Sequence, residues 1–182
     1  MLRPRRAAQG APQAFWYRPA VPFDVGDRVG YPHHGAAVIV SRESREFGGE
    51  VQEFLVLEMA HGELVLRVPV DKADEVGMRP PIGEDEVRDL FELLARKDVR
   101  EPSNWSRRFK NHQEKLKSGD VYQVAEVVRN LALRDLAKGL SAGEKSMYTK
   151  ARDVLVSELS MAMGVTEDEA LEQVQAQFAP AV

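Results

Sequence analysis

The chain has 182 residues, of which 43% are hydrophobic and 30% are charged, so it can bury a core and is not expected to be a disordered polymer. It contains no cysteine, which excludes disulfides, thiolate zinc sites and a cysteine nucleophile. Its formal net charge of −4 gives no global argument for binding nucleic acid, so any basic surface must be local.

Residues 1–22 are predicted to form a disordered extension that is basic and rich in proline. They hold four prolines, four arginines and no acidic residue, and their apolar residues show no periodicity. No apolar run in the chain approaches the roughly 20 residues of a membrane helix, and no apolar stretch follows the basic start. We therefore expect no secretory signal and no membrane contact, and the absence of cysteine is consistent with a cytoplasmic protein.

Residues 23–80 predict a small β module. A strand is expected over Arg28–Tyr31, and further apolar runs of strand length cover 36–40, 54–57 and 64–68. Gly48-Gly49 suits a tight hairpin turn with positive φ, and Pro69 should end the last strand. Four or five short strands in so short a segment indicate a strongly bent sheet or a small barrel of the Tudor/SH3 type.

Residues 84–178 predict an all-α bundle, separated from the β module by the breaker sequence Pro-Pro-Ile-Gly at 80–83. The fold class is therefore α+β, with the β module first. Acidic residues in a first turn, cap residues and capping boxes predict where the five helices begin. These signals are Glu84-Asp85-Glu86, Ser103, Asp120, Ser141 with Glu144, and Thr166 with Glu169.

No catalytic constellation stands out in the sequence. His33 and His34 are adjacent and His61 is a third histidine, but no carboxylate lies at a helical ligand spacing from them. We interpret the histidine pair as a turn between strands, and a hydrolase or metal protein that uses these three residues is the less favoured alternative. Neither a glycine-rich phosphate loop nor a nucleophile elbow is present. The sequence thus predicts a non-enzymatic protein without a cofactor or metal.

The segment 96–117 is the one clear basic stretch. It holds eight bases and three acids, a net charge of +5 in a chain whose overall charge is −4. Phosphate neutralisation by such a stretch gives affinity for nucleic acid without sequence information. Trp105 lies inside it, at the expected start of a helix, among groups suited to phosphate: Asn104, Ser106, Arg107 and Arg108.

The spacing of Trp105 permits two interpretations. Together with Phe109, His112 and Leu116 it forms a stripe at i, i+4, i+7 and i+11, which is typical of a core-facing surface. Alternatively, an aromatic ring in the first turn of a basic helix can stack on a base or enter a base step. Spacing alone slightly favours the core, although Phe109 can belong to the core while Trp105 does not.

Several motifs occur in a defined order along the chain: Val25-Gly26-Asp27, Tyr31-Pro32-His33-His34-Gly35, Leu64-x-x-Arg67-Val68-Pro69, Glu101-Pro-Ser-Asn-Trp105-Ser-Arg-Arg-Phe-Lys110 and Gly139-Leu-Ser-Ala-Gly-Glu-Lys145. With these motifs the chain from Phe23 to about Leu159 resembles the CarD/CdnL family of RNA polymerase-binding regulators, most closely its actinobacterial members. Residues 1–22 are not part of the family pattern.

The resemblance implies a Tudor-like domain over 23–80 that binds a lobe of the β subunit of RNA polymerase, in the holoenzyme with its housekeeping sigma factor. Arg45 and Arg67 correspond to the family's polymerase-facing arginines. The resemblance also implies that the helical domain meets promoter DNA at the upstream edge of the transcription bubble. There Trp105 corresponds to the family's wedge tryptophan and Lys110 to its neighbouring DNA-contacting base.

We therefore expect a regulator that stabilises the promoter open complex and catalyses no reaction. Further DNA contacts are expected from Asn104, Ser106, Arg107 and Arg108, and nothing in the sequence demands a dimer, so a monomer is expected. Two alternatives stay open. One is an adaptor on RNA polymerase without DNA contact, and the other is a stand-alone relative of the polymerase-binding module of transcription-repair coupling factors.

Overall fold

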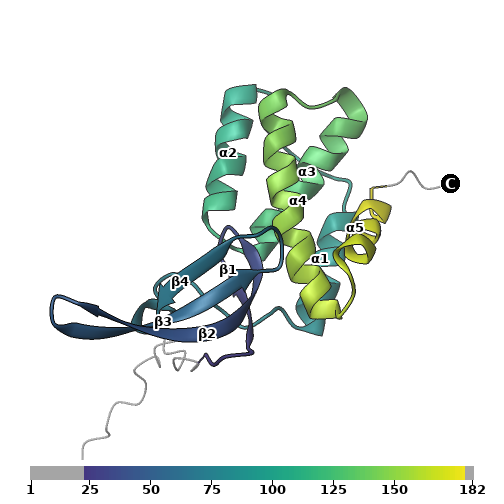
Figure 1. Ribbon diagram of the computed structural model, residues 1–182. Coiled ribbons are helices and arrows are strands. Elements are labelled where there is room, and N and C mark those ends of the chain that lie inside the picture. Colours follow the sequence, from purple (N-terminus) through teal and green to yellow (C-terminus); the bar gives the residue numbers. More distant parts are fainter. Residues whose placement is uncertain (1–22, 179–182) are drawn as a thin grey trace, which may run out of the picture.

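The computed structural model describes residues 23–178, so the extension predicted over 1–22 lies outside the described part of the chain. A four-stranded antiparallel sheet precedes five α-helices (Figure 1), which confirms the α+β class. The elements are β1 (Arg28–Tyr31), β2 (Gly35–Phe47), β3 (Glu50–Met59), β4 (Val65–Pro69), the 3-10 turn η1 (Val70–Lys72), α1 (Glu84–Ala95), α2 (Trp105–Lys117), α3 (Val121–Lys138), α4 (Ala142–Met163) and α5 (Glu167–Ala176).

The sheet is a meander in the order β1-β2-β3-β4. Gly48 and Gly49 turn the long β2–β3 hairpin with φ angles of 62° and 89°, as predicted, and the hairpin projects away from the helices (Figure 1). One face of the sheet buries Val29, Ile39, Leu55, Leu57 and Val68. β1 and β4 lie at opposite edges and do not pair with each other, so the closure of a barrel is not confirmed for residues 23–178.

The helix starts follow the cap signals of the sequence. The Asp120 carboxylate accepts hydrogen bonds from the first turn of α3, and the capping boxes at Ser141/Glu144 and Thr166/Glu169 are both formed. The start of α2 differs slightly: Asn104, rather than Ser103, is its N-cap. A serine and an asparagine both suit this position, so the sequence could not separate two neighbouring candidates.

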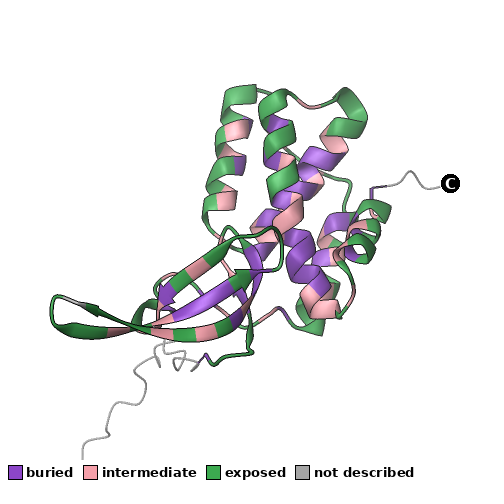
Figure 2. Ribbon diagram, in the orientation of Figure 1, coloured by how far each residue is buried: buried purple, intermediate pink, exposed green. Residues whose placement is uncertain are grey.

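The helices form their own core around α3 and α4 (Figure 2), apart from the core of the sheet. Leu131 of α3 packs with Leu155 and Leu159 of α4, and α1 and α5 cover the same cluster with Leu90 and Val174. By contrast, α2 lies along the side of the bundle and stays largely exposed (Figure 2). A helix with so little buried surface has most of its side chains available for contacts with other molecules.

The sheet meets the bundle at α4. The Ala36 N–H donates to Ser157 Oγ (3.1 Å), and the Arg79 guanidinium donates to Glu158 Oε2 (2.6 Å). Burial raises the pKa of Glu158, while the charge and hydrogen bond of Arg79 oppose that rise. Arg79 also pairs with Gly30 of β1 through its backbone. These contacts join the two cores into one packed body.

Among residues 23–178, no helix combines the length and the apolar character that a membrane crossing requires.

Gly35 generates a prediction about this junction. A Cβ there would lie 2.2 Å from Ser157 Oγ and 3.0 Å from the Val154 carbonyl oxygen, and its φ is 82°. Gly62→Ala is a matched control, because Gly62 has φ 81° and a Cβ there meets no atom within 4 Å. Both substitutions should lower the free energy of unfolding by about 1–2 kcal/mol, because alanine is strained in the left-handed backbone conformation. Gly35→Ala should lower it by about 1–3 kcal/mol more, because the added Cβ overpacks the junction. Urea unfolding of both variants measures the difference, and equal losses would contradict close packing of β2 on α4.

Candidate nucleic-acid interface

Trp105 is the first residue of α2 and is exposed. Asn104 caps the helix, since its Oδ1 accepts the Arg107 N–H (3.0 Å), and 47% of Trp105 remains accessible. The indole stacks on the Phe109 ring, with 5.0 Å between the ring centroids and 22° between the planes. Its Nε1–H donates a long hydrogen bond to Ser141 Oγ (3.4 Å) at the start of α4. The structure thus holds one side of the indole and leaves much of the ring open to solvent.

The helical stripe that contains Trp105 divides into two parts. His112 is buried, and Phe109 and Leu116 are half-buried against the helical core, so the stripe faces the core from Phe109 onward. Trp105 does not join it. Gly143 contributes to this arrangement, because a Cβ there would lie 3.3 Å from the Phe109 ring. The first turn of α4 therefore lets Phe109 approach closely, and Phe109 in turn supports the indole.

Arg108 is buried, with only 2% of its surface exposed. Its Nη2 donates to Glu144 Oε1 (3.0 Å), its Nε to the same oxygen (3.3 Å), and its Nη1 to the carbonyls of Pro102 and Ser103. This removes Arg108 from the DNA-contacting residues expected from the sequence, because its guanidinium binds inside the protein and presents no surface to a phosphate. Its role in this structure is to join α2 to α4.

Glu144 connects that buried ion pair to the tryptophan. Its Oε2 accepts the Ser141 N–H (3.0 Å) and the Ser141 hydroxyl (2.9 Å), and Arg134 Nε of α3 lies 3.3 Å from its Oε1. Burial alone would raise the pKa of Glu144, but these hydrogen bonds and the two guanidinium charges lower it to about 2. The chain of contacts Arg108–Glu144–Ser141–Trp105 fixes where the indole lies.

A second, partly buried pair fixes the loop that precedes α2. His112 Nε2 lies 2.9 Å from Glu101 Oε1, which also accepts a hydrogen bond from Asn130 Nδ2 (2.9 Å). Burial would raise the pKa of Glu101, but the close contact with His112 and the hydrogen bond from Asn130 outweigh it and lower that pKa. The loop is therefore held to α2 and α3 directly before the tryptophan.

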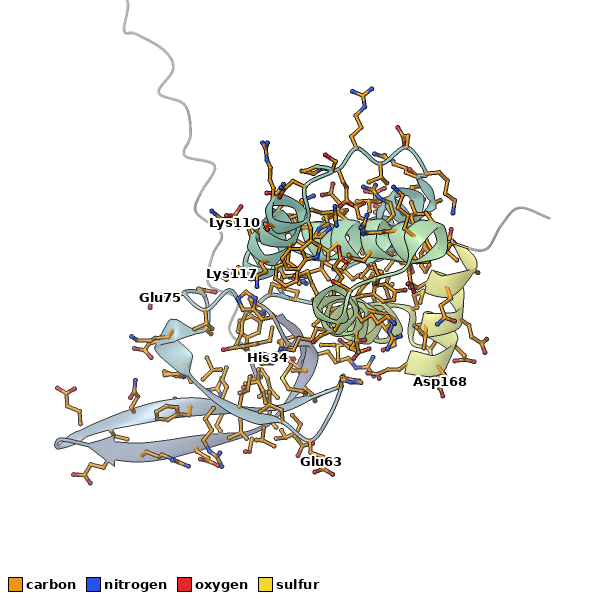
Figure 3. The ribbon with its side chains drawn as sticks, turned by 90° about the horizontal axis from the view of Figure 1, so that it is seen from above. His34, Glu63, Glu75, Lys110, Lys117 and Asp168 are labelled. Carbon is orange, nitrogen blue, oxygen red and sulfur yellow. The ribbon has the colours of Figure 1, made fainter. Side chains whose placement is uncertain are left out.

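The remaining residues expected at DNA lie on the outer surface of α2. Ser106, Arg107 and Lys110 are exposed, and among residues 23–178 the one ion-pair partner of Lys110 is the exposed Glu114, at 3.8 Å. An exposed ion pair at this distance stabilises little and leaves the ammonium free to bind phosphate. Lys110 and Lys117 lie on the same flank of the bundle (Figure 3). Asn104 is also exposed, but its Oδ1 serves as the helix cap.

The two arginines expected at a protein partner converge on one carboxylate. Glu43 Oε2 accepts from Arg67 Nε (3.0 Å) and from Arg45 Nη2 (2.9 Å), so strands β2 and β4 contribute to one polar cluster. Hydrogen bonds from Arg67 and then Arg45 lower the pKa of Glu43, and Glu43 raises the pKa of Arg67. The cluster is exposed, and it lies on a sheet whose edge strand β4 pairs on one side only within the described residues.

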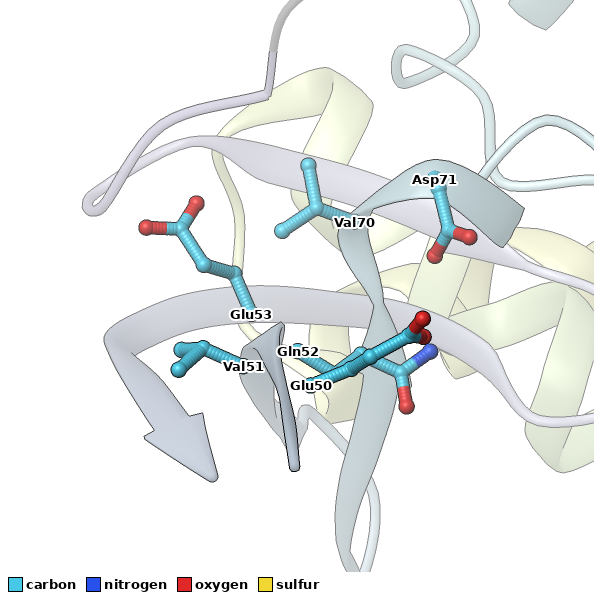
Figure 4. Close-up of a pocket in the computed structure, with 6 residues that line it drawn as sticks. All are labelled: Glu50, Val51, Gln52, Glu53, Val70 and Asp71. Atoms are coloured by element: carbon cyan, nitrogen blue, oxygen red, sulfur yellow. The ribbon is translucent and has the colours of Figure 1, made fainter. Parts of the chain in front are cut away.

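An acidic hollow borders this cluster near the end of the hairpin (Figure 4). Gln52, which is paired with Arg45 across β2 and β3, belongs to its lining. The full lining is Glu50, Val51, Gln52, Glu53, Val70 and Asp71. The hairpin surface therefore presents arginines and carboxylates side by side.

Sequence reasoning missed Ser141 and Arg134 as neighbours of the tryptophan's site. The capping box revealed Ser141 as a helix start, but nothing in its spacing from Trp105 indicated a contact across 36 residues. The histidines give no support to a metal site: across residues 23–178, no three or more His, Cys, Asp or Glu side chains are placed to hold a metal ion. His33 instead binds the Leu116 carbonyl, and His61 binds Glu167.

Comparison with known proteins gives two family matches and a curated relative. The CarD-like/TRCF RID domain matches residues 23–82, and the CarD C-terminal domain matches residues 89–175. The "Putative transcription factor YdeB" of Bacillus subtilis (strain 168) is 32% identical over 145 residues, which are 80% of this chain and 95% of the relative. The similarity therefore includes both the sheet and the helices.

The Glu144 network generates a stability prediction. Glu144→Gln keeps the size of the side chain but leaves Arg108 without its counter-charge, so it should cost about 3–5 kcal/mol in the free energy of unfolding. Glu114→Gln, which removes an exposed carboxylate from α2, should change it by less than about 0.5 kcal/mol. Urea unfolding at pH 7 measures both, and equal small effects would refute the importance of the buried pair.

The same network predicts a pH dependence. The folded-state pKa of Glu144 lies below its ordinary value near 4.3, so its contribution is complete above about pH 5 and is lost as the pH falls toward 2. Wild type should therefore lose about 3 kcal/mol through Glu144 over this range, and Glu144→Gln should show a correspondingly shallower decline.

Proposed function

The chain belongs to the CarD family, and we propose that it is a transcription regulator that binds RNA polymerase and stabilises the promoter open complex. The observation that carries the proposal is the placement of Trp105: an exposed aromatic ring, supported from behind by Phe109 and Ser141, at the start of a basic and largely exposed helix.

We assign polymerase binding to the β module, with 23–80 as a Tudor-like interaction domain for the β subunit of the holoenzyme. Arg45 and Arg67 would bind carboxylates of that subunit, and their convergence on Glu43 supports a common contact surface. The unpaired side of β4 offers backbone donors and acceptors for pairing with a strand of the partner. The arginines then select the partner by charge, while the edge adds backbone hydrogen bonds.

We assign DNA binding to the helical domain, 84–178. Trp105 would enter the distorted minor groove at the upstream edge of the bubble, where the bases are already partly unstacked. Stacking on a base is worth roughly 1–3 kcal/mol, and DNA that is already melted avoids most of the unstacking cost. Arg107 and Lys110 would bind neighbouring phosphates, with Ser106 and the Asn104 side-chain amide as further polar contacts.

The two interfaces act together. Binding to polymerase makes the DNA contact intramolecular, so weak contacts without base specificity suffice. Because the indole has a site only when the DNA is open, the protein shifts the equilibrium toward the open complex and catalyses no reaction. The curated relative from Bacillus subtilis is named as a transcription factor, which supports this interpretation.

The proposed DNA contact predicts a change in open-complex lifetime, which is measured on one promoter after addition of a competitor. Trp105→Ala should shorten the lifetime roughly 5- to 150-fold relative to wild type, because about 1–3 kcal/mol of stacking is lost. Trp105→Phe should retain part of the effect, and Leu136→Ala, which removes an exposed apolar side chain from α3, should have none. An unchanged lifetime with Trp105→Ala, at equal polymerase binding, would favour an adaptor that does not touch DNA.

The proposed polymerase contact can be tested separately from the DNA contact. Arg45→Glu in the full chain should weaken co-purification with the β subunit at least about tenfold, since a carboxylate replaces a cation beside Glu43. Ser44→Glu adds an acid at the neighbouring exposed position, which faces the other side of β2, and should bind as wild type does. Unfolding curves should be similar for both variants. Undiminished binding by Arg45→Glu would show that the arginine pair is not the contact.

A further inference from the structure

A cavity of about 200 Å³ opens where the sheet approaches the helices. The β1–β2 turn provides one wall, and α2, α3 and α4 provide the others. Its floor is apolar and its rim is basic. The floor consists of Leu116, Val124, Ala151 and Val154, and the rim consists of His33, Lys117 and Lys150.

The two lysines of the rim have no acidic partner in the described part of the chain. Both side chains are exposed, and neither Lys117 nor Lys150 has a carboxylate within ion-pair distance among residues 23–178. Lys115, only two residues before Lys117, is paired with Glu126. The pKa of His34 points the same way: burial lowers it most, and the charges of His33 and Lys150 lower it further. Positive charge therefore accumulates at the mouth of the cavity.

The wall formed by the β1–β2 turn is held in a fixed position. The His33 Nδ1–H donates to the Leu116 carbonyl (2.9 Å), and His33 has a φ of 68°, the one positive value among non-glycine residues in the described part of the chain. Pro32 packs against Gly119 so closely that a Cβ on Gly119 would lie 2.7 Å from the proline ring. Strain of this kind persists only where the surroundings enforce it. The cavity is thus built into the fold.

We propose that this cavity binds a small amphipathic anion, with one aromatic ring or a short hydrocarbon chain on the floor and a carboxylate between Lys117 and Lys150. A dry apolar cavity of about 150 Å³ accepts a benzene-sized molecule, so this volume suits a single ring with a short side arm. A DNA phosphodiester offers no apolar group for the floor, which favours a free small molecule over the nucleic-acid backbone. The bound anion would contact both the β1–β2 turn and the helices and would stabilise their junction.

The test uses the full chain and three matched probes: 3-phenylpropionate, its neutral amide and the cationic 3-phenylpropylamine. In an NMR titration, 3-phenylpropionate should shift the amide signals of His33, Leu116, Ala151 and Val154, with a Kd on the order of millimolar or below. The amide should bind at least about tenfold more weakly and the amine should not bind, because the rim is cationic.

Variants separate the cavity from general basic charge. Lys117→Gln with Lys150→Gln should weaken 3-phenylpropionate at least about tenfold and leave the amide unchanged. Lys72→Gln with Lys138→Gln removes two exposed lysines elsewhere and should have no effect. Equal affinity for acid and amide, an equal effect of the two double variants, or no shifts at the lining residues would overturn the proposal. The readout needs neither DNA nor polymerase, so its outcome is independent of the proposed function.

Discussion

The packing of β2 against α4 at Gly35 determines how the two ends of the molecule relate to each other. Gly35 allows the strand to approach Ser157 and Val154 more closely than any side chain would permit, and Arg79–Glu158 adds a partly buried ion pair to the junction. The Arg45–Arg67 cluster lies on the sheet side of this junction. Trp105 lies at the start of α2, about 16 Å along the helix from the Leu116 carbonyl that His33 binds. A packed junction holds the two surfaces in a fixed relative position, so that binding at one end positions the other. A flexible linker would not do this.

The proposed DNA contact also requires a tryptophan that is exposed and yet ordered. Exposure alone would leave the indole free to rotate, and ordering it at the moment of binding would cost affinity. Phe109 supports one side of the ring, and Ser141 accepts its N–H. Ser141 is fixed in turn by Glu144, whose charge is compensated by Arg108 and Arg134. Two buried charged side chains, Arg108 and Glu144, and the partly buried Arg134 thereby contribute to a contact at the surface of the bundle.

Much of this architecture could be predicted from local sequence patterns, because caps, turns and helical stripes depend on neighbouring residues. The start of α4 at Ser141 and the Gly48-Gly49 turn are of this kind. The exposure of Trp105 is not, because its helical spacing slightly favours the core. Arg108 could not be predicted, since its partner Glu144 lies 36 residues away and its basic neighbours resemble a surface segment. The number of strands predicts a small barrel, but pairing between the edge strands β1 and β4 has no local signal in the sequence. The roles of Arg45, Arg67 and Trp105 came from family resemblance rather than from spacing.

In the proposed complex, Trp105 touches promoter DNA while the β module is bound to polymerase. Site-specific photo-crosslinking tests it most directly: a benzophenone amino acid at position 105 is irradiated in a complex of the full protein, RNA polymerase holoenzyme and a promoter. We expect crosslinks to DNA at the upstream edge of the bubble, and their loss when the promoter is held closed. Crosslinks to polymerase subunits alone, with the protein still bound to polymerase, would contradict it.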